Sequence, residues 1–149
     1  MNVQSMVAAS PDGKHICSAY QDIDCIEIYT DDFNSLIRLN GPDRITQKLT
    51  VTETPIGPSA SLKPSNNTFN SLSASEKGFI VGYIGKTPQE DNSTLIQDLL
   101  YFDWSGKCLK CFHLPEGVVY LDIDWENGRM FGVTGGDEPK LVTAKIDLS

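Results

Sequence analysis

The stretch Met6–Gly41, MVAASPDGKHICSAYQDIDCIEIYTDDFNSLIRLNG, decides the fold class of this chain. Short apolar runs alternate in it with clusters of Pro, Gly, Asp and Asn, and this pattern indicates strands rather than helices. Three tight connections in a row predict a four-stranded antiparallel meander. The four expected strands are Met6–Ala9, His15–Tyr20, Cys25–Tyr29 and Ser35–Leu39.

The tight turn before the second strand recurs twice along the chain. Each copy ends in a glycine, where a positive φ is commonly needed, and each follows an alternating strand. The third strand recurs as well, at Leu99–Trp104 and Val142–Ile146. The three turns are Ser10-Pro11-Asp12-Gly13, Ser75-Glu76-Lys77-Gly78 and Trp125-Glu126-Asn127-Gly128.

Repeated four-stranded meanders are typical of β-propeller blades. We predict a single all-β domain over residues 1–149, β-propeller-like, with antiparallel blades at about 5–41, 68–117 and 118–149. The first two blades would have four strands and the last would have three. A two-sheet β-sandwich is the main alternative, because it also uses short strands at regular spacing. The matched turn chemistry favours the propeller.

Two insertions, at 43–68 and 86–97, interrupt the middle of this pattern. Thr46–Thr52 alternates and is compatible with a short extra strand, and the rest is expected to be loop. In a propeller, connections between the second and third strands lie on the same face as the blade-to-blade connections. Both insertions are therefore expected on one face, and long loops on a rigid scaffold are where binding usually occurs. The alternative is that they are tolerated insertions without a role.

Charged residues on the same connections are the candidate ligand-face residues. Carboxylates from neighbouring blades could bind a hard cation such as calcium, although exposed acids are more often simply solvated. The pattern predicts no definite metal site and no other cofactor. The candidates are Asp22, Asp24, Lys86, Glu90, Asp91, Asp137 and Glu138.

The net charge of −8 argues against nucleic acid or an anionic membrane as a partner, because both need a positive patch. No run of 18 apolar residues that could span a membrane is present. The first residues lack the basic and apolar regions of a signal peptide, so the chain as written is expected in the cytoplasm.

The four cysteines are expected to be free thiols. In the proposed pairing Cys17 falls opposite Ile28, so Cys17 and Cys25 are not cross-strand neighbours. Cys108 and Cys111 are three residues apart in a strand, which would point their thiols to opposite faces of the sheet. We expect core cysteines rather than a zinc site. No hydrolase or phosphate-loop motif is present in the sequence, so no catalytic residue is assigned.

The motifs SPDGKHI, IEIYTDDFNSLIRLNGPD, GYIGK and LLYFDWSGKCLKCFHL resemble the TolB-like six-bladed β-propeller proteins of Bacteroides-type bacteria. The resemblance implies that the chain is the C-terminal half of a ring. A second copy or a missing N-terminal half would then complete it. The family also implies a cell-envelope lipoprotein as the longer form.

Three functional hypotheses follow. The first is a non-catalytic binding or protein-interaction scaffold with an unknown ligand. The second is a propeller hydrolase or lyase with a metal in the central channel. The third is a fragment that is inactive alone.

Overall fold

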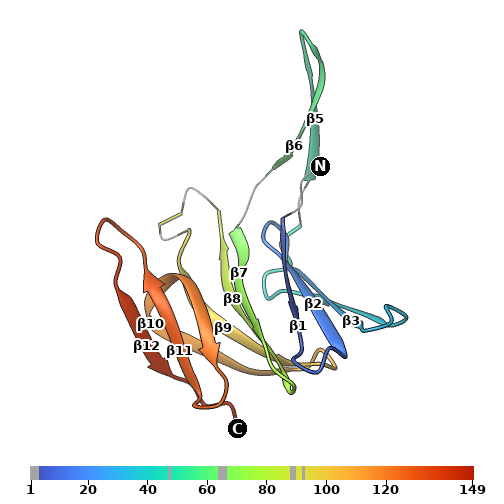
Figure 1. The fold of residues 1–149 in the computed structure, drawn as a ribbon. Helices are drawn as coiled ribbons and strands as arrows, with labels where there is room; N and C mark the ends of the chain where they lie inside the picture. The colour runs from blue at the N-terminus through green and yellow to red at the C-terminus, as the bar shows by residue number, and fades with distance from the viewer. Residues whose placement is uncertain (1–3, 47, 64–66, 88–89, 92) are drawn as a thin grey trace.

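The computed structural model describes the chain except for residues 1–3, 47, 64–66, 88–89 and 92 (Figure 1). The described residues form strands and turns without a helix, so no helix among them could cross a bilayer. The strands form a four-stranded sheet, a six-stranded sheet and a two-stranded hairpin. The all-β class expected from the turn pattern is confirmed.

The first sheet is the meander expected from Met6–Gly41. Its strands pair antiparallel in chain order, and Cys17 lies opposite Ile28 as the sequence predicted. Alternate residues of β3 face the core, so Ile26 and Ile28 are buried by the next blade. The strands are β1 (Ser5–Ala9), β2 (His15–Tyr20), β3 (Cys25–Thr30) and β4 (Leu36–Asn40).

The second sheet contains the other two blades, which are joined by one long strand. We expected the fourth strand of the middle blade to stop at Leu114–Gly117, but β10 continues without a break. The pairing with β9 shifts between His113 and Val118, and such an irregularity lets a strand pass Pro115. The strands are β7 (Asn67–Ala74), β8 (Gly78–Lys86), β9 (Ile96–Asp103), β10 (Cys108–Asp124), β11 (Arg129–Thr134) and β12 (Leu141–Lys145).

The middle blade is buried on both faces. In β8, Phe79 and Val81 belong to the apolar cluster shared with the first sheet, whereas Ile80 belongs to the cluster shared with β10 and β11. This explains why β8 is continuously apolar rather than alternating. The three blades thus stack in layers, with one apolar cluster between the first and middle blades and the other between the middle and last blades.

The first strands of the three blades lie side by side at the inner edge of the stack. Asn70 of β7 donates from Nδ2 to the carbonyl of Val119 at 3.2 Å, and the amide of Leu121 donates to Ser71 Oγ at 3.2 Å. β1 contacts β7 on the side of β7 that faces away from β10 (Figure 1). This radial arrangement, with β1, β7 and the second half of β10 innermost, is that of propeller blades.

The recurring turn glycines meet two different requirements. Gly13 and Gly128 have positive φ angles of 73° and 59°, as expected. Gly78 does not; a Cβ there would lie 2.0 Å from the carbonyl oxygen of Phe102. Close approach of β9 therefore requires glycine at the middle turn.

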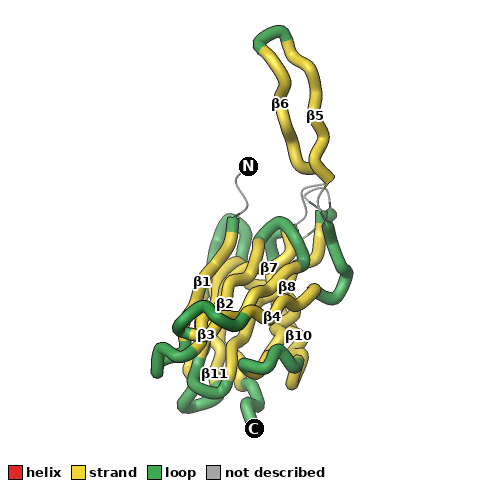
Figure 2. The backbone as a smooth tube through the Cα atoms, turned by 90° about the vertical axis from the view of Figure 1, so that its right-hand side faces the viewer, coloured by secondary structure: helices red, strands yellow, loops and turns green. Residues whose placement is uncertain are grey.

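The first insertion is a β-hairpin rather than the predicted loop with one short strand. β5 (Lys48–Thr54) pairs with β6 (Gly57–Lys63) across the two-residue tip Pro55-Ile56. Figures 1 and 2 show the hairpin projecting away from the blades. Its alternating Thr, Val and Ser residues favour extended pairing over an irregular loop. The second insertion is shorter than predicted, because β8 runs to Lys86 and β9 begins at Ile96.

Candidate functional site

All seven candidate residues lie at one end of the strands, six of them on connections and Lys86 as the last residue of β8. Asp22 and Asp24 lie between β2 and β3, and Lys86, Glu90 and Asp91 lie at the end of β8 or before β9. Asp137 and Glu138 lie between β11 and β12. The described residues of this end contain no group of three or more acidic, His or Cys side chains placed to hold a metal ion.

Asp24 is buried, with 4% of its surface exposed, and its carboxylate is hydrogen-bonded to other residues of this chain. Oδ2 accepts hydrogen bonds from the amides of Asp43 at 3.0 Å and Ile45 at 3.1 Å. The main chain adds two bonds, from the Asp24 amide to the Ile45 carbonyl and from the Gly41 amide to the Asp24 carbonyl, both at 3.0 Å. Asp24 therefore holds the connection that leaves the first blade.

Tyr83 of β8 links this anchor to the middle blade. Its hydroxyl lies 2.7 Å from Asp43 Oδ2 and 3.1 Å from Asp24 Oδ2. Burial raises the pKa of Asp24, and burial together with the two carboxylates raises the pKa of Tyr83. Asp24 Oδ1 is buried without a hydrogen-bond partner among the described residues and packs against Gly41. Sequence reasoning missed Asp43, because no motif marks its contact with a tyrosine 40 positions away.

Thr68 anchors the chain where it returns from the hairpin. Its side chain is fully buried, and its hydroxyl lies 2.8 Å from the carbonyls of both Tyr20 and Ile23. Its amide donates to the Gln21 carbonyl at 2.7 Å. The described ends of the insertion, at 43–45 and at Thr68, are thus attached to the same β2–β3 turn.

The candidates of the β8–β9 connection make local contacts. Lys86 Nζ donates to the Asp91 carbonyl at 3.3 Å, and Glu90 accepts from the amide and hydroxyl of Thr87. These hydrogen bonds lower the pKa of Glu90. Asp137 and Glu138 are exposed in a turn. The role of these residues in binding stays a prediction.

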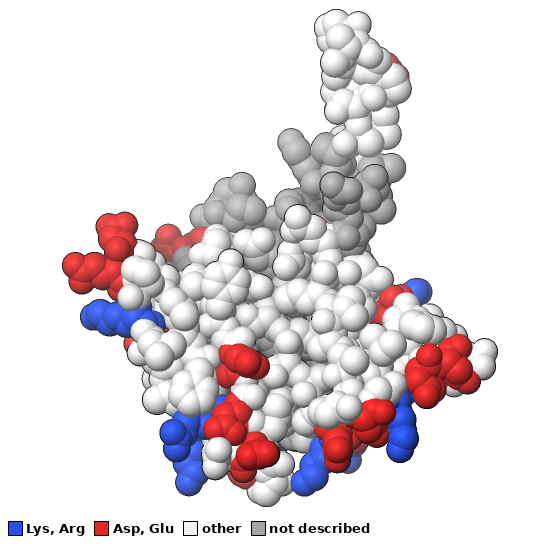
Figure 3. All heavy atoms as spheres, viewed as in Figure 1, with Lys and Arg blue, Asp and Glu red and all other residues white. Residues whose placement is uncertain are grey.

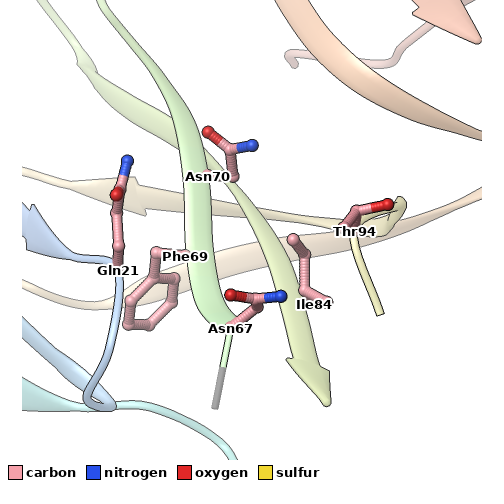
Figure 4. A pocket seen from close by; sticks show the side chains of 6 residues that line it. All are labelled: Gln21, Asn67, Phe69, Asn70, Ile84 and Thr94. Atoms are coloured by element: carbon pink, nitrogen blue, oxygen red, sulfur yellow. The ribbon is translucent and has the colours of Figure 1, made fainter. Parts of the chain in front are cut away.

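A small polar pocket of about 130 Å³ opens at this end of β7 (Figure 4). Gln21 and Phe69 lie on one side of β7, and Asn67 points toward Ile84 on the other side. A second hollow of about 500 Å³ shares Thr94 with it. Carboxamides and hydroxyls suit neutral hydrogen-bonding groups, and no sequence motif marks them. The lining residues of the smaller pocket are Gln21, Asn67, Phe69, Asn70, Ile84 and Thr94.

The outer face of the first sheet exposes apolar side chains. Val7 is 67% exposed and Leu36 is 50% exposed, on the face of the sheet opposite to Ile26 and Ile28. Phe33 packs against Tyr29 beside them, with the two rings tilted by 55°, and is 65% exposed. We call Val7, Phe33 and Leu36 the first end face.

The same outer face of the first sheet also contains one buried charge, that of Glu27. Glu27 is 5% exposed and accepts from the hydroxyls of Tyr20 at 2.8 Å and Tyr29 at 2.6 Å. Arg38 donates to it from Nε at 2.9 Å and also from Nη2. Burial alone would raise the pKa of Glu27, but these donors lower it overall.

The other end of the blade stack has a similar apolar face. Tyr120, Val133 and Leu141 form one row across β10, β11 and β12, with Tyr120 68% and Leu141 77% exposed. Phe131 in the next row is 38% exposed. We call Tyr120, Phe131 and Leu141 the last end face.

The expected positions of two cysteines are wrong. Cys108 and Cys111 are exposed rather than in the core, although Cys17 is fully buried. A bulge in β10 pairs Cys108 with Phe102 and Cys111 with Leu100. Because Phe102 and Leu100 share a face of the sheet, both thiols lie on one face instead of diverging.

Comparison with known proteins identifies the fold. No family model matches the sequence, and no curated protein is similar to it. Among solved structures, the chain is similar to the β-propeller domain of Cps50 (Swd1) from Myceliophteria thermophila, with a TM-score of 0.55 and 15% identity. The match covers 95% of this chain but 35% of that one. The chain therefore has a β-propeller fold and forms an incomplete propeller.

Proposed function

We propose that the chain is a non-catalytic protein-interaction scaffold whose ring is completed by further blades. The single observation that carries this proposal is the pair of apolar end faces on an incomplete propeller. Exposed apolar side chains gathered on one face are typical of interaction sites rather than of ordinary surface. In the interior of the stack, β8 is covered on both sides, and the end sheets lack such a neighbour among the residues that the structure describes.

A second copy is the simplest source of those blades, and the remaining part of a longer chain is the other. In the first case the first end face of one copy contacts the last end face of another, in a head-to-tail arrangement that closes into a ring. Such an interface would bury Val7 and Leu36 on one side and Tyr120 and Leu141 on the other.

The oligomeric state tests the second-copy version. We expect light scattering at micromolar concentrations to give the mass of a dimer, and Leu36→Lys or Leu141→Lys to shift it to a monomer. Ile56→Lys is the matched control, because Ile56 is 99% exposed on the hairpin tip, away from both end faces. A stable wild-type monomer at these concentrations would contradict ring closure by a second copy.

We also propose that the blades belong to the TolB-like type. The support is the resemblance of the SPDGK turn and of the strands that follow it, which the similarity to a propeller domain leaves at the level of fold. The coding region tests this: further blades and a lipoprotein signal in frame upstream are expected, and their absence would argue against the longer form.

A further inference from the structure

The three recurring turns converge on a pocket at the end of the strands opposite to the long connections. The pocket has a volume of about 450 Å³, within the range of small-ligand sites. The second residue of each turn lines it: Pro11, Glu76 and Glu126. Turns that are far apart in the sequence thus build one site, using the same position of the repeat.

Two aromatic side chains form a wall of this pocket. Trp125 and Tyr101 pack with their ring centroids 5.7 Å apart, at an interplanar angle of 58°. Trp125 Nε1 donates to Ser73 Oγ at 3.1 Å, which holds the indole in place. Tyr101 is only 3% exposed and belongs to the apolar cluster shared with β10 and β11.

The charges around the pocket favour a cation. Two carboxylates, Glu76 and Glu126, line it together with one ammonium group, that of Lys77. Figure 3 shows acidic side chains gathered along the lower rim of the molecule, with basic ones among them. The net charge of −8 adds a favourable field for a positive ligand.

We propose that this pocket binds a guanidinium group, as presented by arginine. A guanidinium is planar, stacks on the face of an indole and donates paired hydrogen bonds to carboxylates, so it matches Trp125 and the two glutamates together. A neutral ligand would leave two carboxylates unused, and an anion would be repelled by them. The pocket is made by one chain, so its occupancy does not depend on what completes the ring.

Titration followed by NMR tests this proposal on the intact chain. The chain has two tryptophans, so the indole N–H signal of Trp125 is assigned by its persistence in Trp104→Phe. We expect N-acetyl-arginine amide to shift that signal with a Kd of about 1 mM, a scale set by one small group. N-acetyl-citrulline amide, its neutral isostere, should bind about tenfold more weakly, because it lacks the charge-assisted hydrogen bonds.

Variants separate the contributions of the charges. Glu126→Gln and Glu76→Gln should each weaken arginine amide binding several-fold, and Lys77→Gln should strengthen it by removing a like charge. Glu116→Gln is the matched control, since it removes the same charge from an exposed position that does not line the pocket. Circular dichroism melts confirm that each variant is folded.

The outcomes that overturn the proposal are equally specific. Equal affinity for citrulline amide, weaker binding in Lys77→Gln, or no saturable shift of the Trp125 signal at about 30 mM would each exclude a guanidinium site. The peptide Gly-Gly-Arg-Gly-Gly distinguishes the source of the group. Tighter binding of the peptide than of the amide indicates a polypeptide partner, and tighter binding of the amide indicates a free small molecule; both support the site.

Discussion

Replacing Asp24 by alanine should loosen the base of the projecting hairpin. The carboxylate holds the amides of Asp43 and Ile45 and contacts the Tyr83 hydroxyl, all through Oδ2. Asp24→Ala removes these three interactions without a change in the strands themselves. The connection leaving the first blade would then keep only its main-chain hydrogen bonds to residue 24.

The expected loss of stability depends on which of the three donors can find another partner once the Asp24 carboxylate is removed. A hydrogen bond to a charged group contributes about 1.5–3 kcal/mol. Asp43 is exposed, so its amide can turn to water, and Tyr83 keeps Asp43 Oδ2 at 2.7 Å. Only the half-buried amide of Ile45 loses its partner without a ready substitute, and removal of the buried carboxylate relieves its desolvation. We therefore expect a loss of about 2 kcal/mol, or a Tm lower by about 4–8 °C for a chain of this size.

The pH dependence gives a second readout. Because burial raises the folded-state pKa of Asp24 above 3.8, the stability it contributes is greatest below that value and decreases as pH rises through the folded-state pKa. The difference in unfolding free energy between the wild type and Asp24→Ala should therefore be larger at acid pH than at pH 7. Urea denaturation at several pH values measures it.

Limited trypsin digestion locates the effect. Arg44 lies between the two anchored amides, so cleavage after Arg44 should accelerate by about 30-fold if the whole 2 kcal/mol is lost locally. Asp137→Ala, which removes the same charge from an exposed turn, should change stability by less than about 0.5 kcal/mol. If Asp24→Ala behaves like this control in both assays, the anchoring argument is wrong.

Three further predictions concern neighbouring groups. A Cβ on Gly41 would lie 2.6 Å from Asp24 Cγ, so Gly41→Ala should cost about as much as Asp24→Ala, and a double-mutant cycle in urea should show that the two losses do not add. Thr68→Val preserves shape but removes the hydroxyl that lies 2.8 Å from the carbonyls of Tyr20 and Ile23, so calorimetry should show a loss of about 1–2 kcal/mol; an unchanged Tm would refute the role of Thr68 as an anchor. The folded-state pKa of Glu27 is lowered below 4.5, so its stabilisation is present above that pH and is lost as pH falls through the folded-state value. The stability gap between the wild type and Glu27→Gln should accordingly narrow in acid, and a constant gap from pH 7 to pH 3 would contradict it.

Much of the candidate site was beyond sequence reasoning because it depends on burial. Asp22 and Asp24 look alike in the sequence, as two acids in one turn. Only the packing of β8 against the first sheet buries Asp24 and brings Tyr83 to it. The first insertion was likewise expected to be mostly loop, since Thr and Ser are common in both loops and strands. Its two strands, β5 and β6, pair across the turn Pro55-Ile56, which is not a strong hairpin signal.

The sequence by itself determined the all-β class, the three-unit repeat and the register of the first meander. Strand alternation and turn residues are local properties, and each is set within a few positions of the chain. Only the tertiary structure decided that β10 joins two blades, that Cys108 and Cys111 share a face, and that the end sheets expose apolar surface. It also decided that Pro11, Glu76 and Glu126 line one pocket. These features depend on which segments become neighbours in space, and that is a property of how the blades stack rather than of any stretch of sequence.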